Sequence, residues 1–281
     1  MGWFNRGPVV PVLRFSGAIG MAAPLRPGLS IATLAVPIEK AFSMSKAKSV
    51  AVVINSPGGS PVQSSLLFKR LRQLADETDK KLYVFCEDVA ASGGYYLAVA
   101  GDEIYADASS IVGSIGVISA SFGLDKAIER LGIERRVYTA GTNKGALDPF
   151  QPEKADDIER LKAIQRSVHD VFIGVVKDRR LGRLKGPDSE LFSGAFWSAT
   201  EALELGLIDG ISDVRTKMRE VHGENVRLRV VPIERGWLAS RLRRLPSILG
   251  ASDRVAHQGL AFADDLVSAV EIRALWSRFG L

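Results

Sequence analysis

The chain has 281 residues, 46% of them hydrophobic and 25% charged, and a formal net charge of +5 at pH 7. These values are those of an ordinary soluble globular protein, and the length suffices to bury a sizeable core. The only cysteine, Cys86, excludes an intrachain disulfide, and its apolar surroundings in KLYVFCEDV predict a buried core thiol.

Membrane-spanning and secretory segments are not expected. Arg6, Arg14 and Arg26 interrupt the apolar stretches near the N-terminus before any reaches the roughly 18 residues that a membrane helix needs. The piece ahead of Arg14 is also too short for the core of a signal peptide. We therefore expect a cytoplasmic protein.

Apolar runs and amphipathic stretches alternate in chain order up to about residue 180. The expected elements are strand 9–17, helix 37–45 opened by Pro37, strand 48–55, helix 61–78, strand 80–89, helix 92–101, strands 102–106 and 113–119, helix 123–132, strand 135–141 and helix 152–180. This alternation predicts an α/β domain with mainly parallel strands and helices covering both faces of the sheet.

The C-terminal part has a different character. From about residue 236 the pattern becomes helical and rich in arginine, which predicts a main domain at 1–235 and a helical extension at 236–281. Residues 227–244 hold six arginines and one acid, an excess that equals the whole net charge of +5. RGWLASRLRRLPSIL fits either weak peripheral membrane contact through residues 227–245, or a solvated helix packed on the body or a neighbouring subunit. Nucleic acid is not an expected partner, because no aromatic platform or binding motif accompanies the arginines.

Two glycine pairs follow the two most apolar strands. They lie in NSPGGS (55–60) and AASGGYY (90–96), at the carboxyl ends of strands, where parallel α/β sheets build their sites. Taken alone, SPGG fits a plain turn and Ser92 fits a helix N-cap. Together they fit a nucleophilic hydroxyl at a strand-to-helix turn, facing backbone N–H groups that hold an oxyanion.

A serine nucleophile needs a base to take its proton. His169, His222 and His257 all lie outside the strand-end loops, and we expect them on the solvated surface. The remaining candidate is Lys144 in TAGTNKGALDPF, a loop that follows the expected strand 135–141. The alternative for this lysine is an ordinary surface charge.

NSPGG, ASGGYY, GSIGV and GTNKGALDPF, in this order, resemble the Ser/Lys-dyad peptidases of the signal peptide peptidase A family, in its short one-copy form. GAFWSATEALELGLIDGI at 194–211 is similar to the closing segment of that family, so the resemblance runs from about residue 9 to about residue 215. It implies the Clp protease/crotonase fold, to which this chain adds a helical C-terminal appendage. It also implies a serine endopeptidase that hydrolyses short extended peptides through an acyl-enzyme, without a cofactor or a metal.

The resemblance assigns roles by position. Ser92 matches the nucleophile, and Lys144 matches the general base. Gly59 matches the oxyanion donor, with the N–H of Gly93 as a second donor, and Ser114 in GSIGV matches the serine that orients the lysine amine. Because a lysine base must give up the proton that lysine ordinarily holds at pH 7, the resemblance implies a dry pocket around this amine.

Three features depart from the family pattern: no N-terminal membrane anchor is seen, the domain is present in one copy where long members carry two, and the chain ends in the arginine-rich segment. Val117 stands where the Clp protease relatives carry their histidine, which excludes the Ser/His/Asp version. One copy cannot close a ring, so the resemblance implies a homo-oligomeric ring or dome. Adjacent subunits would then supply Ser92 and Lys144 to a shared site.

Two other functions stay open. A crotonase-type acyl-CoA enzyme would use the oxyanion loop without needing Ser92 or Lys144, and an inactive scaffold would be expected to lose both. For the peptidase, the family implies remnant signal peptides or other membrane-derived peptides, with small or aliphatic side chains before the scissile bond. Such a peptide is expected to add as a strand to an exposed edge near PGGSPV.

Overall fold

The computed structural model describes residues 7–21, 28–233, 270 and 272–281. Its strands are β1 (Val9–Ser16), β2 (Ser49–Ser56), β3 (Lys81–Ala91), β4 (Glu103–Ala106), β5 (Ile111–Gly113), β6 (Phe196–Ser198), β7 (Gly210–Ile211) and β8 (Arg227–Val230). They form one sheet in the order β6-β5-β3-β2-β1-β8, from which β4 and β7 branch at β3. The described pairs are parallel except β5–β6, which confirms a mainly parallel sheet.

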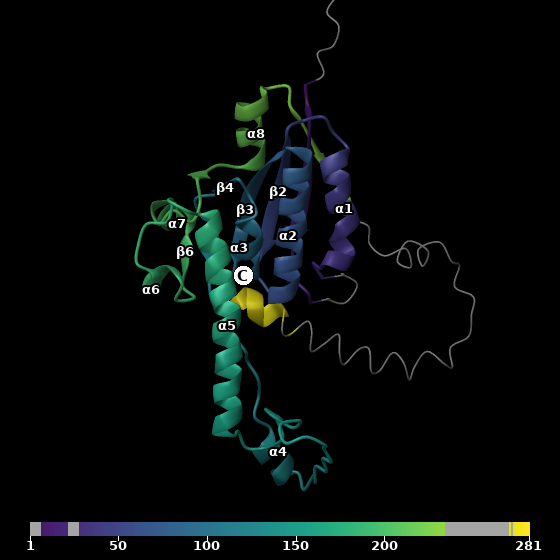
Figure 1. Ribbon diagram of the computed structural model, residues 1–281, viewed down its shortest axis with the longest axis vertical. Coiled ribbons are helices and arrows are strands. Elements are labelled where there is room, and N and C mark those ends of the chain that lie inside the picture. The colour runs from purple at the N-terminus through teal and green to yellow at the C-terminus, as the bar shows by residue number, and fades with distance from the viewer. Residues whose placement is uncertain (1–6, 22–27, 234–269, 271) are drawn as a thin grey trace, which may run out of the picture.

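Helices follow the strands along the chain. They are α1 (Ile31–Ser43), α2 (Pro61–Thr78), α3 (Gly93–Ala98), α4 (Asp125–Arg130), α5 (Ala155–Arg179), α6 (Asp188–Leu191), α7 (Ala199–Glu204) and α8 (Val214–His222). Figure 1 shows α1 and α2 side by side over the sheet, and α5 running from the body to a segment far below it. Within the ranges that the structure describes, no helix combines the length and the apolar character that crossing a membrane requires.

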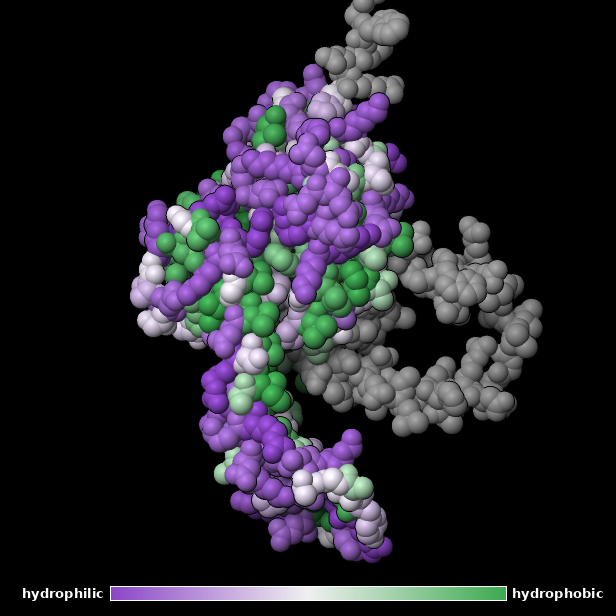
Figure 2. All heavy atoms as spheres, in the orientation of Figure 1, coloured by the Kyte–Doolittle hydropathy of each residue, from purple (hydrophilic) through white to green (hydrophobic). Residues whose placement is uncertain are grey.

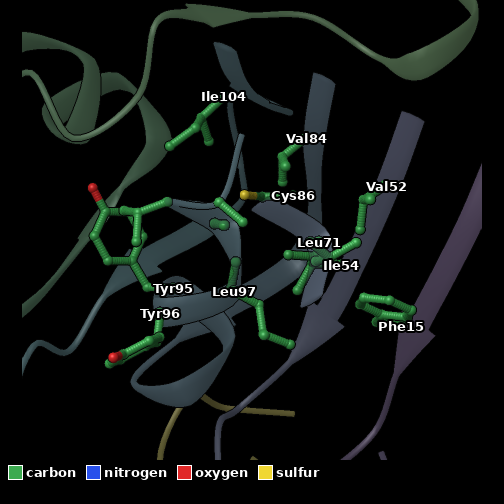
Figure 3. Close-up of a cluster of buried hydrophobic side chains, with 14 of the residues drawn as sticks. Phe15, Val52, Ile54, Leu71, Val84, Cys86, Tyr95, Tyr96, Leu97 and Ile104 are labelled. Carbon is green, nitrogen blue, oxygen red and sulfur yellow. The ribbon is translucent and has the colours of Figure 1, made fainter. Parts of the chain in front are cut away.

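The main core lies between the sheet and the helices α1, α2 and α3. Leu67, Leu71 and Leu74 form one stripe of α2, and they are buried against the strands. Figure 3 shows the side chains of the strands gathered with those of α2 and α3 into one cluster. Cys86 belongs to this cluster, where burial raises the pKa of its thiol to about 12, so the predicted core thiol is confirmed.

The opposite face of the sheet carries smaller cores. Met218 of α8 packs there with Val10, Val12, Ala51, Val53, Tyr83, Phe85 and Tyr105. Near the carboxyl ends of β3 and β5, Phe279 and Trp276 pack on Val89, Ala91 and Ile111. Both faces are therefore covered. Most of the predicted extension at 236–281 lies outside the described residues, and the proposed boundary at residue 235 remains a prediction.

Strand β3 brings together the segments that follow β3 and β5. Its first half pairs with β4, and its last residues, Val89–Ala91, pair with β5. Asn55 lies where the register between β2 and β3 shifts, and its side chain donates to Asp88 and accepts from the Val89 N–H. Ala91 is thereby paired with Gly113, so the residues that follow them leave the sheet side by side.

Three predicted elements were wrong in their bounds or their existence. Helix α1 begins well before Pro37, because Ser30 and Thr33 form a capping box; Pro37 then lies inside the helix, where its missing N–H removes one helical hydrogen bond. The strand expected at 113–119 ends at Gly113, where the chain bends away from the sheet. The stretch 135–141 is exposed and has no strand partner, so it forms no strand despite its β-branched and aromatic residues.

Residues 117–154, which we call the arm, connect β5 to α5. The helix α4 has no buried residue, and most of the arm is exposed. Figure 1 places α4 at the far end of α5, away from the sheet. The helix α5 therefore acts as a stalk, with its C-terminal part packed on the body and its N-terminal part beside the arm.

A buried arginine anchors this stalk. The side chain of Arg180 is 1% exposed; its Nε and Nη2 donate to the carbonyl of Gly206 at 2.9 and 2.7 Å, and its Nη1 donates to Asp209 at 2.8 Å. Arg179 donates to the carbonyl of Val99, directly after α3, at 3.0 Å. The end of α5 is thus bonded both to the helix that follows Ser92 and to the segment before β7.

Replacing this arginine should destabilise the fold strongly. Arg180→Met leaves the carbonyl of Gly206 and the carboxylate of Asp209 without their buried partner, so we expect the free energy of unfolding to fall by about 3 kcal/mol. Arg183 binds the same carboxylate at 3.0 Å but is 45% exposed, and Arg183→Met should cost less than about 1 kcal/mol. Urea unfolding of both variants measures the difference, and equal losses would contradict the anchoring role of Arg180.

Candidate active site

Ser92 occupies a sharp turn between β3 and α3. Its φ of 51° and ψ of −121° lie in a region that residues other than glycine seldom adopt, at a cost of about 1–3 kcal/mol. Its N–H donates to the carbonyl of Gly113 at 2.8 Å, and its carbonyl accepts from the N–H of Tyr96 at 2.9 Å. The hydroxyl makes no capping bond to α3, so Ser92 does not act as a helix cap.

The two glycine loops touch through their backbones. A Cβ on Gly58, whose φ is +102°, would lie 2.8 Å from the Gly93 nitrogen and 2.8 Å from the Ser92 Cβ. A Cβ on Gly93 would lie 2.5 Å from the Ser64 Oγ, and one on Gly94 would lie 2.6 Å from the carbonyl oxygen of Ser56. Side chains at these positions would therefore separate the two loops. The sequence pattern indicated Gly59 and Gly93 and gave no role to Gly58, although Gly58 belongs to the same glycine pair.

Gly59 is fixed by a second backbone contact. With a φ of +140°, it forms a bridge with Ile19, whose carbonyl oxygen would lie 2.2 Å from a Cβ on this glycine. The N–H groups of Gly59 and Gly93 donate to no backbone acceptor among the described residues. Both glycines line the same hollow as Ser92. Two unpaired donors beside a hydroxyl are the arrangement that an oxyanion requires.

The hollow beside Ser92 is a small apolar cavity of about 60 Å³. It is lined by Gly59, Pro61, Ser64, Ser65, Ser92, Gly93, Tyr96, Gly116, Val117, Val168, Val171 and Phe172. Tyr96 packs on Phe172 with 4.9 Å between ring centroids, and on Phe68 edge to face at 5.6 Å. The contribution of α5 to this cavity was not foreseen, because nothing in its helical pattern indicates which turn reaches the sheet edge.

Ser114 lies beside the Ser92 turn, as its place after β5 requires. Its side chain is buried, its φ is 53°, and its N–H donates to the carbonyl of Ala195 at 2.7 Å. Because Ala91 and Gly113 are paired, Ser92 and Ser114 are the first residues beyond two neighbouring strands. The structure therefore brings four of the five predicted site residues to one edge of the sheet.

The fifth residue, Lys144, lies elsewhere. It belongs to the arm, in an exposed turn where its N–H donates to the carbonyl of Gly141 at 3.2 Å. It does not line the cavity of Ser92, and the arm stands away from the sheet in Figure 1. Within this single chain, the expected dry pocket around Lys144 is absent from the described residues.

The histidines differ from their expected surface positions. His169 is half-buried, with its Nε2 3.0 Å from the carbonyl oxygen of Ile115. His222 is half-buried at the end of α8, with its Nε2 2.9 Å from the Ser49 Oγ, and burial lowers its pKa. The expectation of solvated rings was wrong for both, because contacts to distant segments of the chain do not show in the local sequence. His257 lies outside the described residues.

Gly58→Ala should lower both the reactivity of Ser92 and the stability of the fold. The new Cβ meets Ser92 and Gly93, so we expect loss of reactivity at Ser92 together with a loss of stability of about 1–3 kcal/mol. Gly223→Ala is the matched control, because Gly223 also has a positive φ but nothing within 4 Å. Urea unfolding and labelling of Ser92 by a fluorophosphonate measure both effects. Full labelling of Gly58→Ala would contradict the importance of the contact.

Known proteins similar to this chain carry two kinds of name. The Na(+)/H(+) antiporter NhaA of Brucella abortus (strain 2308) is 54% identical over 275 residues, which are 97% of this chain and 37% of that protein. Serine protease SPPA, chloroplastic, of Arabidopsis thaliana is 33% identical over 72% of this chain and 30% of its own length. The putative signal peptide peptidase SppA of Enterococcus faecium is 30% identical over 58% of this chain and 47% of its own.

This chain thus spans less than half the length of each of these relatives. The antiporter name describes a protein of which 37% is matched, so ion transport is not carried over to this chain. The family model of peptidase family S49 matches residues 75–226, a range that contains the Ser92 turn, β5, the arm and α5. The parallel sheet and its covering helices fit the Clp protease/crotonase-like fold. The chain therefore belongs to peptidase family S49, which confirms its resemblance to the signal peptide peptidase A family.

Proposed function

We propose that this protein is a serine endopeptidase that hydrolyses short extended peptides through an acyl-enzyme. The observation that carries the proposal is the strained turn of Ser92, which holds the hydroxyl at a small apolar cavity beside two unpaired N–H groups. Ser92 is the nucleophile. Membership of family S49 supports a peptidase over an acyl-CoA enzyme of the same fold.

The chemistry follows from the positions of these groups. Attack by the Ser92 hydroxyl on a peptide carbonyl creates a negative charge on the carbonyl oxygen, which the N–H groups of Gly59 and Gly93 stabilise. The base takes the hydroxyl proton and returns it to the leaving amine. The base then takes a proton from a water molecule, whose oxygen attacks the acyl carbon. The bond to the serine oxygen breaks, and that oxygen takes the proton back from the base, which releases the second product and restores the serine.

We propose that Lys144 is the base and that it reaches Ser92 from a neighbouring subunit. Lys144 is exposed on the arm of its own chain, whereas a base that works at neutral pH has to lose its proton, which burial favours. A second copy that covers the arm would bury the amine and bring it to Ser92. Ser114, buried beside the Ser92 turn, is the residue that orients it.

Exposed apolar side chains support this assembly. Along α5, Leu161, Ile164, Val168 and Val171 follow one another at spacings of three, four and three residues, the pattern of a helix seam. Val175 continues this spacing but packs on the main core of its own chain. Ile164 and Val171 are 57% and 58% exposed, and Figure 2 shows apolar side chains along this helix. On the arm, Phe122 and Tyr138 are 82% and 91% exposed. Apolar surface of this extent is typical of a protein interface, and we propose that it joins subunits of a homo-oligomeric ring or dome.

The size of the cavity favours substrates with small or aliphatic side chains before the scissile bond. Its volume of about 60 Å³ is well below the roughly 150 Å³ that holds a benzene ring, so aromatic side chains are too large. Its lining presents no charged side chain. Remnant signal peptides and other membrane-derived peptides remain the proposed substrates. A cytoplasmic location remains part of the proposal. So does weak membrane contact through residues 227–245, of which 234–245 lie outside the described residues.

A fluorophosphonate should label the wild-type protein at Ser92. Ser92→Ala should remove the label, whereas Ser65→Ala, a serine in the lining of the same cavity, should retain it. Mass spectrometry of the labelled peptides identifies the modified residue. A label that survives Ser92→Ala, or that never forms, would contradict the proposed nucleophile and favour the acyl-CoA enzyme or the inactive scaffold.

Two inactive variants should restore each other if subunits share the site. Ser92→Ala and Lys144→Ala, co-expressed in equal amounts, should recover about a quarter of wild-type activity, because a random neighbour pair holds an intact serine and an intact lysine with probability one half times one half. Lys126→Ala, another lysine of the arm, should remain active alone. Native mass spectrometry confirms that the oligomers contain both variants. Inactive mixed oligomers would contradict the shared site.

A further inference from the structure

The ring of His169 bonds to the backbone beside the proposed site. His169 lies on α5 between Val168 and Val171, both of which line the cavity of Ser92. Its Nε2 lies 3.0 Å from the carbonyl oxygen of Ile115. A carbonyl oxygen can only accept, so Nε2 must carry the hydrogen and donate it. The second ring nitrogen takes no part in this bond, which forms whether or not that nitrogen is protonated.

The carbonyl that accepts this bond lies directly before the residues that line the cavity. Ile115 directly follows Ser114 and directly precedes Gly116 and Val117, which form one wall of the cavity. Val117 is also the first residue of the arm. Among the described residues, the next backbone hydrogen bond along it is that of Leu124. Loss of the bond to His169 would therefore leave the wall attached to the body on one side alone.

The opposite side of the wall is held by close packing. A Cβ on Gly116 would lie 3.0 Å from the Cα of Gly194, and Ser114 donates to the carbonyl of the next residue, Ala195. The segment before β6 thus supports the wall from one side. The ring of His169 supports it from the side of α5. Ile115 itself is fully buried, so no water can reach its carbonyl as a substitute donor.

We infer that His169 is a positioning residue that fixes the wall formed by Gly116 and Val117, and thereby sets which side chains the cavity accepts before the scissile bond. The inference rests on the proposed peptidase function. With the tether in place, the cavity keeps its volume of about 60 Å³ and excludes large side chains. Without the tether, Gly116 and Val117 move away from the cavity, the volume of the cavity increases, and larger side chains enter.

Two nearly isosteric substitutions separate the hydrogen bond from the shape of the side chain. Gln and Glu have the same length and both favour helices, but only Gln donates a hydrogen bond to a carbonyl. Peptides that differ only in Ala or Leu before the cut give the ratio of their kcat/KM values in each variant. We expect His169→Gln to keep the wild-type Ala-to-Leu ratio. In His169→Glu the ratio should fall about fivefold, the size of one net hydrogen bond.

Hydrogen exchange of the Ser114 amide, which donates to the carbonyl of Ala195 next to the tether, tests the tether on the same samples without requiring activity. It should accelerate about fivefold or more in His169→Glu and stay at the wild-type rate in His169→Gln. Equal exchange rates in the two variants, or equal Ala-to-Leu ratios with both variants folded, would overturn the inference. Failure of wild-type protein to cleave any peptide would overturn the proposed function instead, and the exchange data would still decide on the tether.

Discussion

The contact between two glycine loops is the constraint on which the site depends. Gly58 lies so close to Ser92 and Gly93 that no side chain fits between them. This approach accompanies a backbone conformation that serine seldom adopts, and it places Gly59 and Gly93, whose N–H groups have no backbone acceptor among the described residues, in the lining of the cavity. The stability of the parallel sheet, whose two central strands end at this point, offsets the free-energy cost of this strain.

The stalk helix α5 links this edge to the rest of the molecule. Its end is bonded to the body through Arg180 and Arg179, and its middle lines the cavity and holds the carbonyl of Ile115. Its other end stands beside the arm that carries Lys144. One helix therefore shapes the cavity beside Ser92 and also carries a partly exposed apolar seam. Assembly and catalysis would share the same element.

Local patterns were sufficient for much of the fold. Apolar runs located β1, β2 and β3, and the leucine stripe located α2, because these elements bury a face whose period shows in the sequence. The glycine pairs located the Ser92 turn. The arm was misjudged: the residues at 135–141 have the composition of a strand, but they meet no partner within the chain. The position of Lys144 and the bonds of His169 depend on contacts between distant segments, which spacing along the chain does not encode.

We propose that one chain holds an incomplete site and that a second copy completes it. A structure of the assembled protein at a resolution that shows side chains tests this most directly. We expect the Lys144 Nζ of one subunit to lie about 2.6–3.2 Å from the Ser92 Oγ of its neighbour and to be buried there. An assembly in which every Lys144 remains exposed to solvent and away from every Ser92 would contradict it.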